Sequence, residues 1–149
     1  MQIALWLHLM GVVVWVGGMF FAHLALRPAA QALPPPMRLP LLAGTLARFF
    51  PWAGAAVVAI LASGAWLVYG SGGFRAVGAA VHAMTGIGLV MALVYGYIVT
   101  VPFRALRTAV LASNWEAGGA AMGSVRRLVA FNLVLGLVTI AIAALGRGA

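Results

Sequence analysis

Four long apolar stretches constrain this chain more than any other feature of its sequence. Leu, Val, Ile, Ala and Gly dominate each of them, and they lie at about residues 3–26, 51–69, 77–101 and 128–145. A helix needs about 20 apolar residues to cross a bilayer, so each stretch is long enough to span one. Lipid offers the backbone no hydrogen-bond partner, which favours helices, and the alternating pattern of a membrane β-barrel is absent. The sequence therefore predicts an all-α integral membrane protein, a bundle of four transmembrane helices.

The arginines predict how this bundle is oriented. Seven of the nine fall in the connections 27–50 and 102–127, whereas Arg75 lies between the second and third stretches and Arg147 in the C-terminal tail. Because cytoplasmic connections carry an excess of basic residues, we expect both termini on the outer, periplasmic side of a bacterial inner membrane. The first stretch has no basic start and is longer than the apolar core of a signal peptide, so we expect a true span. Residues 1–149 then form one multi-pass domain.

The two cytoplasmic connections differ in character. The second half of 27–50 follows three consecutive prolines and is predicted to lie as a short amphipathic helix on the membrane surface. Residues 102–127 are predicted to extend a helix and to break it at Gly118 and Gly119. The single carboxylate of the chain, Glu116, lies in this connection, where we expect a surface role and no catalysis.

Composition removes most kinds of chemistry. The chain has one Glu and no Cys, Lys or Asp, and only 7% of its residues are charged. Carboxylate pairs, Ser–His–Asp triads, calcium cages, P-loops, thiolate zinc sites and iron–sulfur clusters are therefore excluded. A net charge of +8 does not indicate a nucleic-acid partner, because too little polar surface remains for a soluble DNA-binding face. Histidines are left as the side chains that ligate metals well: His8, His23 and His82.

Two of these histidines are predicted to lie at the same depth. His8 is five residues into the first stretch and His82 about five residues into the third, and both stretches start from the outer face. At 1.5 Å per residue, both imidazoles are expected roughly 8 Å below the outer boundary. A bis-imidazole site between two helices requires such a match, and an ionisable residue within a membrane is a functional candidate. The alternative is that each histidine packs in the core and bonds a backbone carbonyl.

Haem b is the ligand that a pair of imidazoles suits best. The pair fills both axial positions of the iron, whereas a closed zinc site needs four ligands, and without Cys the haem is not covalently attached. The small residues Gly11 and Gly86, beside the two histidines, would leave room for a porphyrin, although glycines also allow close helix packing. Arg75 and Arg147 are candidate partners for the haem propionates.

Three residues deeper in the spans complete the set of candidates. Trp15, two turns below His8 on the same face, would line the haem pocket or pack in the core. His23 lies roughly 22 Å further in than His8, so we expect it at the cytoplasmic interface rather than in the outer site. Asn132, inside the fourth stretch, is predicted to make a hydrogen bond between helices.

Copper is the alternative ligand. Each outer histidine is followed two residues later by a methionine, Met10 or Met84, and imidazole with thioether suits copper(I). Residues i and i+2 of a helix point about 200° apart, so neither pair can chelate one ion and a methionine from another helix would be needed. A structural membrane subunit without a cofactor is a third possibility.

A resemblance to known proteins rests on three segments, LHLMGVVVWVGGMFFA, VHAMTGIGLVM and NLVLGLVTIAIAALGR. They resemble the CopD-like membrane proteins, a family named for copper resistance, and are similar to the HemJ-like four-helix haem proteins. The second resemblance implies an inner-membrane bundle whose haem b is held by a first-helix histidine, here His8, and implies protoporphyrinogen oxidation. HemJ-like proteins carry a lysine in their third helix, where this chain has no lysine and His82 stands in that region.

Together these features predict a b-type haem membrane protein that acts in electron transfer or as an oxidoreductase, with His8 and His82 as axial ligands. Two filled axial positions favour electron transfer over oxygen chemistry. The expected partners are the lipid bilayer and a quinol or porphyrin substrate, with a homodimer through 102–127 as a further possibility. Copper transport or copper tolerance is the alternative function.

Overall fold

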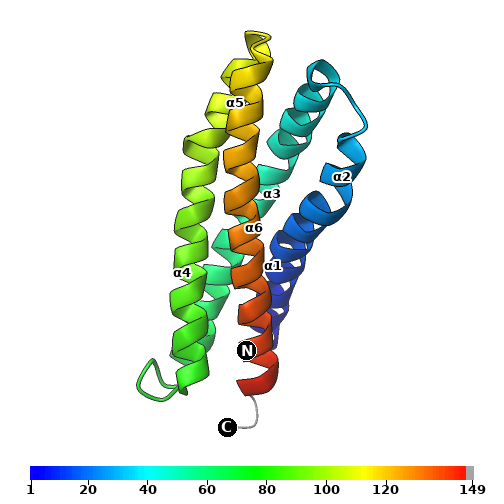
Figure 1. Ribbon diagram of the computed structural model, residues 1–149. Coiled ribbons are helices and arrows are strands. Elements are labelled where there is room, and N and C mark those ends of the chain that lie inside the picture. The colour runs from blue at the N-terminus through cyan, green and yellow to red at the C-terminus, as the bar shows by residue number, and fades with distance from the viewer. Residues whose placement is uncertain (147–149) are drawn as a thin grey trace.

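Seven helical segments make up the computed structural model, which describes residues 1–146 (Figure 1). They form four units that are long and apolar enough to cross a membrane: α1 through α2, α3, α4 through α5, and α6. Each unit corresponds to one predicted apolar stretch, and the described residues contain no strand, so the all-α prediction of four potential spans is confirmed. The segments are α1 (Gln2–Phe21), the π-helix η1 (Ala22–Leu26), α2 (Arg27–Ala30), α3 (Pro35–Gly70), α4 (Ala79–Thr100), α5 (Pro102–Leu111) and α6 (Trp115–Leu145).

The first unit changes its winding where a proline enters it. Pro28 has no N–H to donate, and in a regular helix its ring collides with the carbonyl four residues earlier, at Leu24. The backbone widens into the π-turn of η1, and Pro28 then lies in the first turn of the short α2. Such π-turns are frequent at functional sites. This one carries His23.

The second unit is longer than its apolar stretch. α3 begins at Pro35 and continues through Pro51, so residues 35–50 form the first half of one helix. The prediction of a separate amphipathic helix on the membrane surface, in the second half of 27–50, is therefore wrong. The physical reason is burial, because one face of this half packs against α4, α5 and α6 and holds it in line. The buried side chains of that face are Leu39, Ala43, Leu46 and Phe50.

A proline also ends α4. Val101, the residue before Pro102, has φ −114° and ψ −80°, because the proline ring disfavours a helical conformation at the preceding residue. α5 follows and turns back into α6 through a short turn in which Ser113 has a φ of 53°. The side chain of Asn114 accepts a hydrogen bond of 3.0 Å from the backbone N–H of Ala117 and so caps α6.

The predicted position of the helix break is wrong, because the chain breaks between Leu111 and Trp115. Gly118 and Gly119, where we expected the break, both lie inside α6. Gly118 is buried, and a Cβ at this position would lie 3.1 Å from Leu39 Cδ1 of α3. A glycine inside a helix costs about 1 kcal/mol relative to alanine. The close approach of α3 to α6 offsets that cost, which the local sequence does not reveal.

The four units form a bundle in which neighbours along the chain are not always neighbours in space (Figure 1). α1 packs mainly against α3, whereas α4 and α5 pack mainly against α6. α1 and α4 consequently lie on opposite sides of the α3–α6 pair (Figure 1), and Trp15 of α1 contacts Tyr95 of α4. The first and last described residues lie at the same end, and α2 and α5 lie at the other.

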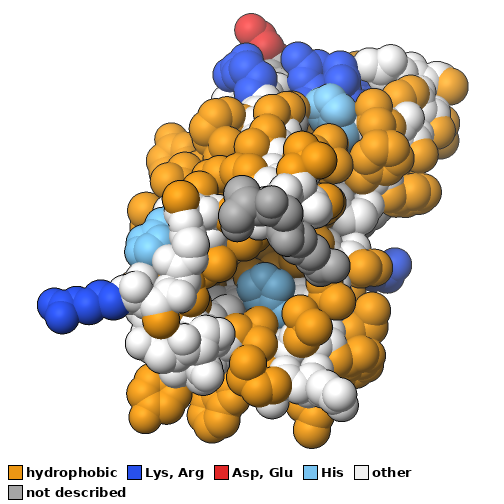
Figure 2. All heavy atoms as spheres, turned by 90° about the horizontal axis from the view of Figure 1, so that it is seen from below, with side chains coloured by type: hydrophobic (Ala, Val, Ile, Leu, Met, Phe, Trp, Pro, Cys, Tyr) orange, Lys and Arg blue, Asp and Glu red, His pale blue; other side chains and the backbone are white. Residues whose placement is uncertain are grey.

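Apolar side chains cover most of the surface seen in Figure 2. Many large ones are exposed, among them Leu93 at 75% and Trp6 at 60%, as expected for helices that face lipid. The arginine side chains visible in Figure 2 gather mostly on one side of the molecule, and the histidines lie apart from one another. A multi-pass membrane protein is therefore the class that the surface and the helix lengths support.

Replacing Gly11 by alanine should push α1 away from α3. A Cβ at Gly11 would lie 2.7 Å from Ile60 Cγ1 and 3.1 Å from the Ala56 carbonyl oxygen. Gly17 is the matched control, because it is exposed on the same helix and a Cβ there meets nothing within 4 Å. Both changes gain the same helix propensity, so overpacking should set the free energy of unfolding of G11A in detergent about 1–3 kcal/mol below that of G17A. Equal stabilities would contradict the close packing.

Candidate functional site

The structure places the two predicted axial ligands in different surroundings. His8 extends from α1 toward α3, which is the main partner of α1. His82 lies in the first turns of α4 and is exposed, with its Nδ1 3.1 Å from the carbonyl oxygen of Gly78 and its ring 5.6 Å from that of Phe74. The structure therefore does not bring His8 and His82 together at one site.

His8 is held by the backbone and a side chain of α3. Its Nδ1 lies 3.1 Å from the carbonyl oxygen of Ile60 and 3.1 Å from the hydroxyl oxygen of Ser63. The imidazole edge lies over Gly64, where a Cβ would come within 3.4 Å of His8 Cε1. Ser63 is buried, and the imidazole itself is half-buried. A ring fixed in this way has a single well-defined orientation.

The partners of Nδ1 assign the tautomer of His8. The Ile60 carbonyl can only accept a hydrogen bond. The Ser63 hydroxyl donates its one hydrogen to the carbonyls of its own helix, at Ala59 and Ile60, so its oxygen is an acceptor toward His8. Nδ1 must therefore carry the proton. In a neutral imidazole this leaves an unprotonated lone pair on Nε2, and no hydrogen bond to Nε2 is found within residues 1–146.

This arrangement is the one that metal-ligating histidines use. A ligating imidazole almost always donates its other ring N–H to a carbonyl, a carboxylate or water, which fixes both its tautomer and its orientation. The described residues contain no group of three or more His, Cys, Asp or Glu that could hold a metal. His8 is therefore oriented as a metal-ligating histidine is, but it does not belong to a closed cage of such residues within residues 1–146.

The other predicted site residues fall in different places. Gly11 is buried where α1 meets Ile60 and serves close packing. Gly86 is exposed on α4, with nothing within 4 Å of a Cβ at that position. Arg75 is exposed in the turn before α4. Arg147 lies outside the described residues.

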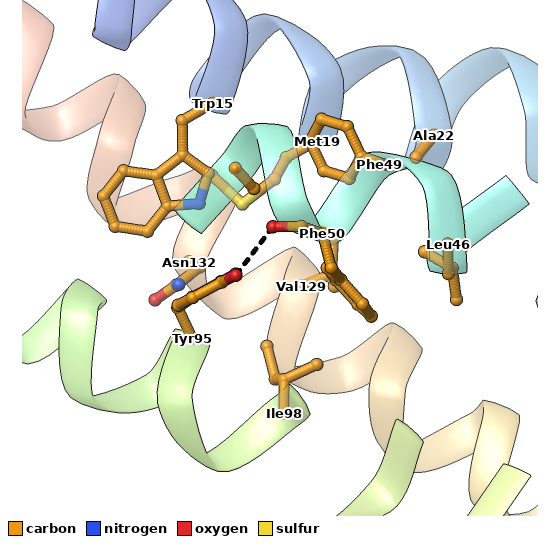
Figure 3. A pocket seen from close by; sticks show the side chains of 11 residues that line it. Trp15, Met19, Ala22, Leu46, Phe49, Phe50, Tyr95, Ile98, Val129 and Asn132 are labelled. Carbon is orange, nitrogen blue, oxygen red and sulfur yellow. Dashed lines mark hydrogen bonds between the residues drawn. The ribbon is translucent and has the colours of Figure 1, made fainter. Parts of the chain in front are cut away.

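Trp15 lines a small cavity at the centre of the bundle (Figure 3). The cavity has a volume of about 20 Å³, enough for about one water molecule. Trp15 is 3% exposed and packs edge-on against Tyr95, with ring centroids 6.2 Å apart. The side chains of Met19 and Asn132 also form its wall. Trp15 therefore belongs to the core and also lines a cavity, but this cavity lies deeper than His8.

Two polar groups at this cavity are fixed by backbone carbonyls. The Tyr95 hydroxyl donates to the Phe50 carbonyl at 2.7 Å (Figure 3). This approach is possible because Gly54 has no side chain, since a Cβ there would lie 2.7 Å from the hydroxyl oxygen. Asn132 Nδ2 donates to the Met91 carbonyl at 3.0 Å, which confirms the predicted bond between helices. Asn132 Oδ1 is buried and has no partner within the described residues. A cavity of this size beside such an oxygen suits a bound water.

Sequence reasoning missed Ser63 and Tyr95. Both lie inside predicted spans, and each is a polar residue in an otherwise apolar run. Because the unpaired polar group of such a residue is costly in hydrocarbon, this isolation was the available signal that each contacts another helix.

Comparison with known proteins gives one result. The family model CopD, described as copper resistance protein D, matches residues 43–145. No curated protein and no solved structure matches the chain.

Replacing Tyr95 by phenylalanine should loosen the contact between α4 and α3. The change removes the hydroxyl that bonds the Phe50 carbonyl, a loss of about 0.5–1.5 kcal/mol in the free energy of unfolding. Tyr97, two residues further along α4, is 54% exposed and provides the control variant Y97F. Unfolding in detergent should show Y95F destabilised relative to Y97F. The hydrogen bond would be refuted by a Y95F variant as stable as wild type.

Proposed function

Since the chain belongs to the copper resistance protein D family, we propose that it is a membrane protein that handles copper, with His8 as a copper ligand. The observation that supports this proposal is the fixed tautomer of His8, whose Nδ1 is held by Ile60 and Ser63 while Nε2 keeps a free lone pair. Imidazole nitrogen is a good ligand for copper in either oxidation state. Family membership supports copper as the metal.

The rest of this face of α1 supports a path for copper into the bundle. Met19 follows His8 by eleven residues, which places it on the same face of the helix and about 16 Å further along. Its thioether is a soft ligand of the kind that copper(I) prefers. Met19 is 3% exposed and lines the central cavity with Trp15. We propose that copper enters at His8 and that Met19 offers the next ligand inward, which is a transport or tolerance function.

A b-type haem held by His8 is the second candidate, because the same free nitrogen suits a haem iron. The residues do not fit a haem enclosed between α1 and α4, since α1 packs mainly against α3 and His82 is exposed with its Nδ1 at the carbonyl of Gly78. The central cavity of about 20 Å³ is far below the roughly 300 Å³ of a small-molecule pocket. With a haem at His8, the proposed activity is electron transfer or an oxidoreductase reaction, and the proposed partner is a quinol or a porphyrin. A homodimer through residues 102–127 is a separate proposal.

Copper binding by purified variants tests the proposal. Wild-type protein in detergent, loaded with copper(I) under reducing conditions and desalted, should retain copper in elemental analysis. H8A should lose most of it, because the prepared nitrogen is gone, and S63A should bind about tenfold more weakly because the ring is less firmly oriented. H82A is the control and should bind as wild type does, since His82 is exposed and apart from His8.

Three outcomes would count against copper at His8. They are a wild-type protein that retains no copper, an H8A variant that binds copper as well as wild type does, and a loss of binding in H82A alone. A Soret absorbance band that H8A abolishes, in protein expressed with a haem supply, would favour the second candidate.

A further inference from the structure

A second cavity lies at the end of the bundle opposite the chain termini, between η1, α3 and α6. Its volume is about 30 Å³, and it opens at the surface where α1 passes into α2. Three nitrogen-bearing side chains line it, from three different segments: His23 of η1, Arg27 of α2 and Arg126 of α6. All three residues are half-buried. We call this space the cationic cavity.

No acidic side chain lines the cationic cavity. The chain has one carboxylate side chain, that of Glu116, which is exposed in the first turn of α6. Glu116 precedes Arg126 by ten residues, or about 15 Å along the helix axis, which is too far for an ion pair. Arg27 and Arg126 therefore contribute to the wall of one cavity from different helices, with no acidic residue beside them in that wall.

Two cationic residues at the wall of one cavity favour the binding of an anion. Like charges repel, and an anion between them relieves that repulsion. The fold places all three residues at this cavity, because His23 lies in the π-turn next to Pro28 and Arg126 lies on the face of α6 that lines the cavity. A phosphate group matches these donors well, because arginine binds phosphate through paired N–H groups and a histidine adds a further donor.

The remaining walls of the cavity are apolar, and they indicate where the phosphate comes from. The volume of about 30 Å³ accommodates roughly two water-sized groups, so phosphate oxygens fit while the rest of a larger ligand stays outside. The apolar walls continue into the surface of helices that are apolar enough to cross a membrane. These walls are formed by Ala22, Leu26, Leu42, Leu46, Met122, Val125 and Val129.

We propose that the cationic cavity binds the phosphate of an anionic phospholipid, with Arg27 and Arg126 holding the phosphate oxygens and His23 donating a further hydrogen bond. Basic pockets between membrane helices recognise acidic lipid headgroups in this way. The site is independent of His8, which lies at the other end of α1, and it does not rest on copper binding. Bound lipid ties η1, α2 and α6 together at this end of the bundle.

The test uses the full chain in detergent micelles doped with either phosphatidylglycerol or phosphatidylcholine, with retained lipid measured by native mass spectrometry and stability by thermal unfolding. Wild-type protein should retain phosphatidylglycerol in preference to phosphatidylcholine, and its Tm should rise only with the former. The double variant R27Q/R126Q should bind phosphatidylglycerol at least about tenfold more weakly. The matched control is R104Q/R127Q, which removes the same charge at two exposed arginines and should bind as wild type does.

Two further measurements keep the proposal open to refutation. R126K retains the charge but not the paired donors, so it should fold and bind phosphatidylglycerol more weakly than wild type, which separates phosphate recognition from general attraction. Inorganic phosphate at equal ionic strength should not raise the Tm. A rise with inorganic phosphate equal to that with phosphatidylglycerol would overturn the lipid as the source. Equal retention of the two lipids by wild type, or equal losses in both double variants, would overturn the site.

Discussion

The close packing of α1 against α3 is the constraint on which the rest of the account depends. Gly11 has no side chain, and this lets Ile60 and the Ala56 carbonyl approach α1 closely enough for His8 to reach the backbone of α3. The same contact excludes a porphyrin from this interface. The contact therefore fixes the proton of His8 on Nδ1 and leaves Nε2 with a free lone pair.

Backbone carbonyls hold the polar side chains inside the bundle. His8 is held by Ile60, Tyr95 by Phe50 and Asn132 by Met91, each on a neighbouring helix, whereas buried Ser63 donates to carbonyls of its own helix. Glycines make room for two of these side chains, Gly64 beside His8 and Gly54 beside Tyr95. Asn132 Oδ1 has no partner within residues 1–146 and suits a bound water, while the arginines of the cationic cavity suit the anion that we propose there.

The number of potential spans followed from the sequence because the span of a bilayer is a local requirement on each apolar stretch. Helix length did not follow, because α3 and α6 begin well before their apolar stretches. Helix pairing did not follow, because helices that are apolar all round carry no periodic signal of which face meets which neighbour. Equal depth for His8 and His82 thus could not reveal that α1 packs against α3 and that His82 lies on an exposed face of α4. The prediction of a helix break at Gly118 was wrong for a related reason. Gly118 packs against Leu39, and this contact joins segments that are distant in the sequence.

The tautomer of His8 is the most direct test of the central claim, and nitrogen-15 NMR of histidine-labelled protein measures it. The account predicts that His8 in metal-free protein carries its proton on Nδ1, and that the signal of Nε2, not of Nδ1, changes when copper(I) is added. H8A identifies the signal by its loss. A proton on Nε2 in the metal-free protein, or copper bound through Nδ1, would contradict the account.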